Sequence, residues 1–209
     1  MSWDLDAYGA LLEAARGYRF VHFDHEPQEG ELLLRHDVDF SLAAAVQMAE
    51  LEAAHGASAT YFLMTRGVFY NLASHEGDAA LQRLRELGHR VGLHAVYPHI
   101  DIDDRFDPVL AWHNPDPEFM NAPLDGVVNV MAPPWFDRAH YRSDSNQHWR
   151  SGDPTAALAA REFEWLQLLT HPVIWAFDGT RMRETMESML AAERAERWRQ
   201  LEEDRIDLS

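Results

Sequence analysis

The sequence contains no cysteine. Disulfide bonds, thiolate metal ligands and a cysteine nucleophile are therefore excluded. Any transition-metal site would have to be built from histidine, aspartate and glutamate, because these are the remaining side chains that bind such metals well. The chain has 12 histidines and 35 acidic residues, so suitable ligands are abundant.

Long apolar runs are also missing from the sequence. No stretch approaches the ~20 apolar residues that cross a bilayer, so we expect no contact with a membrane. Residues 1–6 are acidic and lack the basic start and apolar stretch of a secretory signal. The sequence therefore favours a cytoplasmic location.

Positive charge is scarce. The 18 basic residues are outnumbered by the acidic ones, and the formal net charge is −17. Such a chain repels phosphate backbones, so nucleic acid is not expected as a partner. The acidity keeps the protein soluble and favours a metal or a small neutral or cationic substrate.

The composition is that of an ordinary globular protein. Hydrophobic residues make up 46% of the chain and charged residues 25%. A length of 209 residues is enough for one domain with a sizeable core. No internal repeat, linker or low-complexity tract divides the chain. We therefore expect a single domain over residues 1–209.

Strands and helices are predicted to alternate between residues 31 and 94, which indicates an α/β fold with parallel strands and right-handed crossovers. Apolar patterns and glycine stop signals predict the elements. The predicted strands are 18–23, 31–36, 59–64, 91–94, 109–113, 127–131, 141–144 and 168–171, and the predicted helices are 3–16, 42–55, 79–87, 156–166 and 180–206.

Polar residues suited to catalysis follow several of these strands. In parallel α/β folds, ligands bind at the carboxyl ends of the strands. A single strand-end aspartate is more often a turn former or helix cap, but such residues at the ends of five strands indicate a common site. The candidates are Asp37, Asp39, His94, His113, Asp144 and His171.

Asp37 and Asp39 lie two residues apart, so a continuing strand would place both on the same side. Two neighbouring carboxylates repel each other unless one binds a cation or holds a proton. A divalent metal on Asp39, with zinc as the preferred ion, would resolve this repulsion. Asp37 could then take a proton from a water that the metal activates near neutral pH.

Five segments, in order, resemble the motifs of the polysaccharide deacetylase superfamily in its "RHDVD" branch. Together they cover roughly residues 31–175. The matching segments are 34–39 with 56–62, 88–94, 112–115, 141–145 with Trp149 and Arg150 behind it, and 166–172.

This resemblance implies a distorted (β/α) barrel of about seven parallel strands, here with a long C-terminal helix. It also implies hydrolysis of an acetyl group from an amino sugar or a sugar ester. By carry-over, Asp37 is the general base and His171 the general acid, while Asp39 and His94 bind the metal. Trp149 and Trp135 are expected as walls of the substrate pocket, because both lie beside motif segments.

Two departures from the family pattern leave alternatives open. The family's second metal-binding histidine lies four residues after the first, whereas here His99 lies five residues after His94, behind a proline. We take His99 as the third ligand for its proximity to the family position, with His113 as the alternative. The family's third-motif arginine is not evident, and Arg142 could supply that positive charge.

The segment between the second and third motifs is short, so one barrel helix is expected to be absent and the site open on one side. Two other functions remain: hydrolysis of a small amide or imide, and a non-catalytic barrel that binds a sugar or a metal. The C-terminal helix carries an apolar stripe, Met182, Met186, Met189 and Leu190, which predicts packing on the barrel or against a second subunit in a homo-oligomer.

Overall fold

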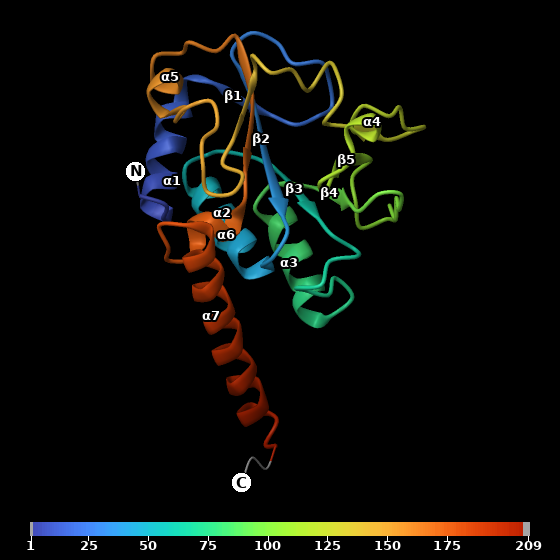
Figure 1. Ribbon diagram of the computed structural model, residues 1–209, viewed down its shortest axis with the longest axis vertical. Helices are drawn as coiled ribbons and strands as arrows, with labels where there is room; N and C mark the ends of the chain where they lie inside the picture. Colours follow the sequence, from blue (N-terminus) through green and yellow to red (C-terminus); the bar gives the residue numbers. More distant parts are fainter. Residues whose placement is uncertain (1, 207–209) are drawn as a thin grey trace.

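In the computed structural model, which describes residues 2–206, the chain folds into a sheet of strands and a set of helices (Figure 1). The strands are β1 (Arg19–Val21), β2 (Glu31–Val38), β3 (Thr60–Leu63), β4 (Arg90–Ala95), β5 (Val109–Trp112), β6 (Val128–Asn129), β7 (Tyr141–Ser143) and β8 (Trp165–Thr170). The helices are α1 (Leu5–Ala14), a 3-10 turn (Ala15–Gly17), α2 (Leu42–Ala54), α3 (His75–Glu86), α4 (Pro117–Met120), α5 (Thr155–Ala159), α6 (Pro172–Ala176) and α7 (Met182–Glu203).

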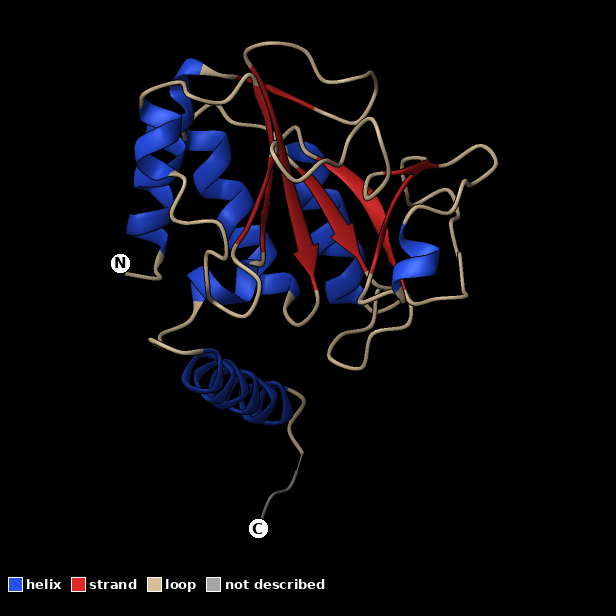
Figure 2. Ribbon diagram, turned by 45° about the horizontal axis from the view of Figure 1, so that its top comes forward, coloured by secondary structure: helices blue, strands red, loops and turns tan. Residues whose placement is uncertain are grey.

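Seven strands form one curled sheet in the order β6-β5-β4-β3-β2-β8-β7. β1 pairs with the first half of β2, and every pair is parallel. Within residues 2–206 no ladder joins β6 to β7, so the sheet is a half-barrel with two free edges (Figure 2). The predicted α/β fold of about seven parallel strands with a long C-terminal helix is confirmed.

β2 lies near the centre of this sheet, and all eight of its residues are buried. Its alternating side chains therefore face two different interiors. Leu32, Leu34 and Val38 pack in the larger core between the sheet and the helices, together with residues of α1 and α2. Leu33 belongs to a small apolar core on the other face.

The helices that follow β2 and β3 begin and end where the sequence supplies the signals. Ser41 caps α2 by accepting the N–H of Ala44, and Ser74 caps α3 in the same way. Gly56 and Gly88 follow these helices with φ of 69° and 88°, a backbone conformation that glycine adopts at little cost. These short connections return the chain to the start of β3 and of β4.

Between β4 and β5 the chain forms a loop without a helix, as expected from the short spacing of the motifs. Two other sequence predictions were wrong in detail. The helix predicted over 156–166 ends at Ala159, because Arg161 adopts a left-handed φ of 56° and the chain then enters β8 at Trp165. The short helix α6, which begins at Pro172 directly after β8, was not predicted.

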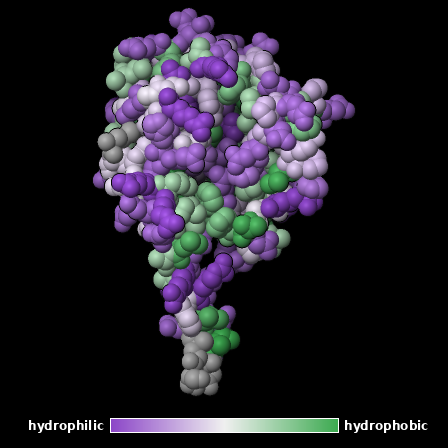
Figure 3. Space-filling model, in the orientation of Figure 1, coloured by the Kyte–Doolittle hydropathy of each residue, from purple (hydrophilic) through white to green (hydrophobic). Residues whose placement is uncertain are grey.

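α7 is anchored to the body through its first turns, where Thr185 and Met189 are buried. The rest of the helix projects away from the body in Figure 1, and its exposed apolar residues include Leu190, Trp198 and Leu201. Figure 3 shows apolar side chains among polar ones near the projecting end. The predicted packing on the body therefore holds for part of the stripe, and homo-oligomerisation through this helix stays a prediction.

Among residues 2–206, no helix combines the length and the apolar character needed to span a membrane.

Candidate metal centre and active site

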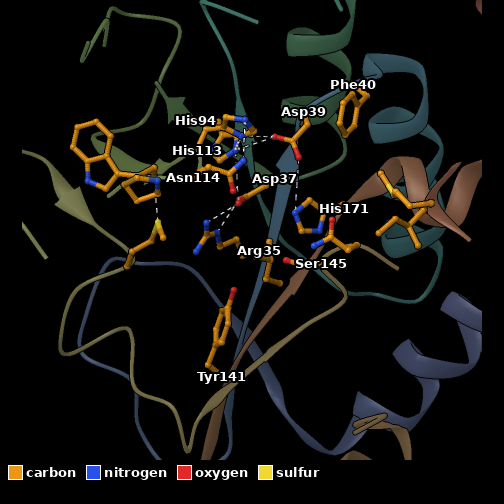
Figure 4. A pocket seen from close by; sticks show the side chains of 17 residues that line it. Arg35, Asp37, Asp39, Phe40, His94, His113, Asn114, Tyr141, Ser145 and His171 are labelled. Carbon is orange, nitrogen blue, oxygen red and sulfur yellow. Dashed lines mark hydrogen bonds and ion pairs between the residues drawn. The ribbon is translucent and has the colours of Figure 1, made fainter. Parts of the chain in front are cut away.

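The site is built at the carboxyl end of β2, where alternate side chains point into the half-barrel. Arg35, Asp37 and Asp39 line one cavity of about 260 Å³. His36, between them in the sequence, points to the helix side, where its ring lies 4.4 Å from that of Tyr61. Asp37 and Asp39 therefore point to the same side of the strand, as predicted (Figure 4).

Asp39, His94 and His113 bring three potential ligand atoms together. Asp39 Oδ1 lies 3.0 Å from His94 Nε2 and 3.0 Å from His113 Nδ1, and the two ring nitrogens are 3.2 Å apart. Ligands about 2.1 Å from a tetrahedral zinc ion are separated by about 3.4 Å. The three atoms therefore need only small outward movements to hold such an ion.

The hydrogen bonding of His94 indicates a cation between these atoms. Its Nδ1 lies 3.0 Å from the carbonyl oxygen of Ala111, which can only accept, so Nδ1 carries the proton. Nε2, the other ring nitrogen, faces Asp39 Oδ1 and His113 Nδ1 and is the ligand atom that a metal could use. Asp39 Oδ1 is buried and accepts no well-aligned hydrogen bond. A divalent metal bound by all three residues would satisfy this orphaned oxygen.

The ionisation of Asp39 agrees with a cation-binding role. Burial acts to raise the pKa of Asp39, but the facing His113 and His94 outweigh it and hold that pKa far below its usual value. Without a metal, interaction with the Asp39 carboxylate raises the pKa of His113. The centre thus combines one ionised carboxylate and two imidazoles, a ligand set suited to zinc and similar ions.

The structure does not bring His99 to this group. His99 is exposed in the loop after β4, where its N–H donates to the carbonyl oxygen of Val96 in a turn. His113 lies beside Asp39 and His94 instead, because β4 and β5 are paired with His94 opposite Ala111. The end of β5 therefore delivers His113 beside His94.

Asp37 is paired with an arginine from its own strand. Arg35 donates from Nε to Asp37 Oδ1 at 2.8 Å and from Nη2 to Oδ2 at 2.6 Å, a bidentate ion pair. Both residues are buried. Burial acts to raise the pKa of Asp37, but the Arg35 guanidinium outweighs it, so that pKa is lowered and the carboxylate stays ionised.

Arg35 thus supplies the positive charge beside Asp37 that sequence reasoning sought in Arg142. Arg142 donates to the carbonyl oxygens of Ala139 and Tyr141 and lies over the Phe163 ring, and it does not line the cavity. The signal was present in the sequence: residues 35 and 37 of one strand must share a face.

His171 lies across the cavity from the His94–His113 pair in Figure 4, held by Asp144. Its Nδ1 is 2.6 Å from Asp144 Oδ1, while Asp144 Oδ2 accepts the backbone N–H of His171 and the indole N–H of Trp175. Burial acts to lower the pKa of His171, but Asp144 outweighs it and raises that pKa to about 9. The ring is therefore protonated at neutral pH, with Nε2 directed toward the site.

The two predicted pocket tryptophans do not line the cavity. Trp149 is buried in the outer core, where its ring stacks on Trp3 at a centroid distance of 5.9 Å. Trp135 packs against the inner core and donates its indole N–H to the carbonyl oxygen of His25. The cavity walls come from other residues, namely Phe40, Trp112, Met131, Tyr141, Leu169 and Met182.

Comparison of the sequence with models of known protein families and with curated proteins finds no match. Among solved structures, a peptidoglycan deacetylase from Bdellovibrio bacteriovorus is similar, with a TM-score of 0.43 and 15% sequence identity. The match covers 88% of this chain and 54% of that one, so the chain spans about half the length of the structure that it matches. A likeness at this level does not bear on what the chain acts on.

Proposed function

We propose that this protein is a metal-dependent hydrolase that removes an acyl group, acetyl in the first instance, from an amino sugar or a sugar ester. One observation carries the proposal: a carboxylate and a protonated imidazole flank the three-residue metal centre. Asp37 Oδ2 lies 3.8 Å from His94 Nε2, and His171 Nε2 lies 3.9 Å from Asp39 Oδ2. A base, an acid and a cation site thus share one cavity.

Asp37 and His171 are in the ionisation states that hydrolysis needs. Asp37 is ionised and can accept a proton from an attacking water. His171 Nε2 carries a proton that it can donate to the departing amine or alkoxide, while Asp144 on Nδ1 fixes the ring. A metal held by Asp39, His94 and His113 would supply Lewis-acid polarisation of the acyl carbonyl.

The test is acetate release from N-acetylated and O-acetylated sugars by purified protein supplied with Zn²⁺. Asp37→Asn should lower the rate by about 10²–10⁴-fold, because it removes the base and changes the shape little. Asp101→Asn is the matched control, since Asp101 pairs with Arg66 outside the cavity, and it should retain wild-type activity. An Asp37→Asn enzyme as active as wild type would refute the assigned role.

The substrate class is tested in the same assay with small amides, imides and formyl compounds beside the sugars. We expect turnover of the acetylated sugars. Turnover of the small amides alone would keep the metallohydrolase mechanism but replace the substrate. A protein that binds Zn²⁺ stoichiometrically and turns over nothing would instead be a non-catalytic barrel.

A further inference from the structure

Gln167 is a buried polar residue below the metal centre that plays no part in the proposed chemistry. It lies in β8, with no exposed surface, opposite Leu33 of β2 and Tyr141 of β7. Its side chain points into the half-barrel, because it shares a strand face with Leu169 and His171, which line the cavity. A buried amide needs a hydrogen-bond partner for each of its polar atoms.

The surroundings of Gln167 fix the orientation of its amide. Nε2 lies 3.0 Å from the carbonyl oxygen of Val130 and 2.6 Å from that of Trp135. Because both of these groups only accept, the nitrogen must face them. Oε1 is therefore directed to the other side, where it accepts from Arg35 Nη1 at 3.2 Å.

Arg35 is therefore held through its three side-chain nitrogens and one face of the guanidinium. Nε and Nη2 bind Asp37, Nη1 binds Gln167, and the guanidinium lies 5.6 Å from the centroid of the Phe62 ring. Asp37 alone would leave the Nη1 edge of a buried cation without an acceptor. Such an edge would favour rotation of the guanidinium away from its bidentate geometry.

We propose that Gln167 is a positioning residue that orients Arg35 and, through Arg35, the Asp37 carboxylate. The two carbonyl bonds also tie this pair to the segment between β6 and β7, which carries Met131 of the cavity wall. Gln167 thereby couples the shape of that wall to the alignment of the base. The effect on catalysis rests on the proposed function, whereas the effect on Arg35 does not.

Two variants separate the roles of the Gln167 side chain. Gln167→Met keeps the length and removes every side-chain hydrogen bond, whereas Gln167→Glu keeps an oxygen for Arg35 and replaces the donor to the two carbonyl oxygens with an acceptor. Gln147→Met is the matched control, because Gln147 is also buried and donates to a backbone carbonyl oxygen, that of Gly179. It tests whether any loss of a buried glutamine amide has the same result.

The first readout is the ¹H–¹⁵N signal of the Arg35 Nε–H group, identified by its absence in Arg35→Lys and measured without metal. In wild type and in Gln147→Met we expect a sharp signal that exchanges slowly with water. Gln167→Met should speed that exchange by at least about tenfold, and Gln167→Glu should retain most of the protection. An unchanged Arg35 signal in Gln167→Met would overturn the proposal.

The second readout is steady-state kinetics with Zn²⁺ and the best substrate. Gln167→Met should lower kcat by about 10–100-fold and leave KM within about threefold, because misalignment of the base affects the transition state more than binding. An equal loss in Gln147→Met would show a merely structural effect. If wild type shows no turnover, the proposed function fails, and the Arg35 signal still decides the role of Gln167.

Discussion

Replacing Glu52 with alanine should strongly destabilise the protein, although Glu52 lies outside the cavity. Glu52 is in α2 and is fully buried. Its carboxylate accepts from the hydroxyl groups of Tyr8 at 2.5 Å and Tyr61 at 2.7 Å, and it lies 2.6 Å from His36 Nε2. The network joins α1, α2, β2 and β3, and His36 extends it to Thr170 of β8 at 2.8 Å.

The size of the effect follows from the partners that remain. Glu52→Ala leaves two buried tyrosine hydroxyl groups without an acceptor and removes the carboxylate beside the buried His36 ring. A buried donor without a partner costs about 1–3 kcal/mol, so the two hydroxyl groups together account for about 2–6 kcal/mol. We therefore expect a loss of about 3–5 kcal/mol, a large fraction of the roughly 5–15 kcal/mol by which domains are stable.

The effect should also depend on pH. Burial acts to raise the pKa of Glu52, but interaction with His36 outweighs it, and the folded-state pKa lies below the ordinary value of 4.5. A lowered carboxyl pKa contributes stability that is fully present above the ordinary value and is lost as the pH falls through the folded-state pKa. The difference in unfolding free energy between wild type and Glu52→Gln should therefore shrink as the pH falls below 4.5.

The assay is urea unfolding at pH 7, repeated at decreasing pH. Glu50→Ala is the control on the same helix, because Glu50 is exposed and pairs with Arg83 at the surface. That variant should lose no more than about 0.5 kcal/mol. A loss below about 1 kcal/mol in Glu52→Ala, or one equal to that of the control, would refute the reasoning from unsatisfied partners.

Three further outcomes are expected. Elemental analysis should find that His113→Ala loses the bound divalent metal and that His99→Ala keeps it. Loss of the metal in both variants, or in neither, would contradict His113 as the third ligand. In the metal-free protein, NMR titration should give His171 a pKa of about 9, and Asp144→Asn should lower it, because the Asp144 carboxylate is what raises it. Gly92→Ala should lower the free energy of unfolding, measured in urea, by about 1–3 kcal/mol, because an added Cβ would lie 2.6 Å from a buried phenylalanine ring. An unchanged stability would show that the ring moves freely.

The sequence alone predicted the parallel sheet and the positions of those cavity residues that follow from the spacing of residues along one strand. Alternating strand and helix patterns predicted parallel strands, and the two-residue spacing placed Asp37 and Asp39 on the same side of β2. His94 and His171 line the cavity from the strand ends where the sequence placed them, and their roles stay predictions. These inferences succeed because the period of a strand and the direction of a crossover are properties of the local chain.

Only the tertiary structure decided which groups meet across strands. The pairing of β4 with β5 places His113, and not His99, beside Asp39 and His94, and the burial of Trp149 among other aromatic rings removes it from the cavity wall. The hydrogen bond between Arg35 and Gln167 joins residues 132 positions apart, which no local pattern encodes. Strand register and helix packing determine such contacts, because they bring side chains from distant segments into one buried space where each polar group must find a partner.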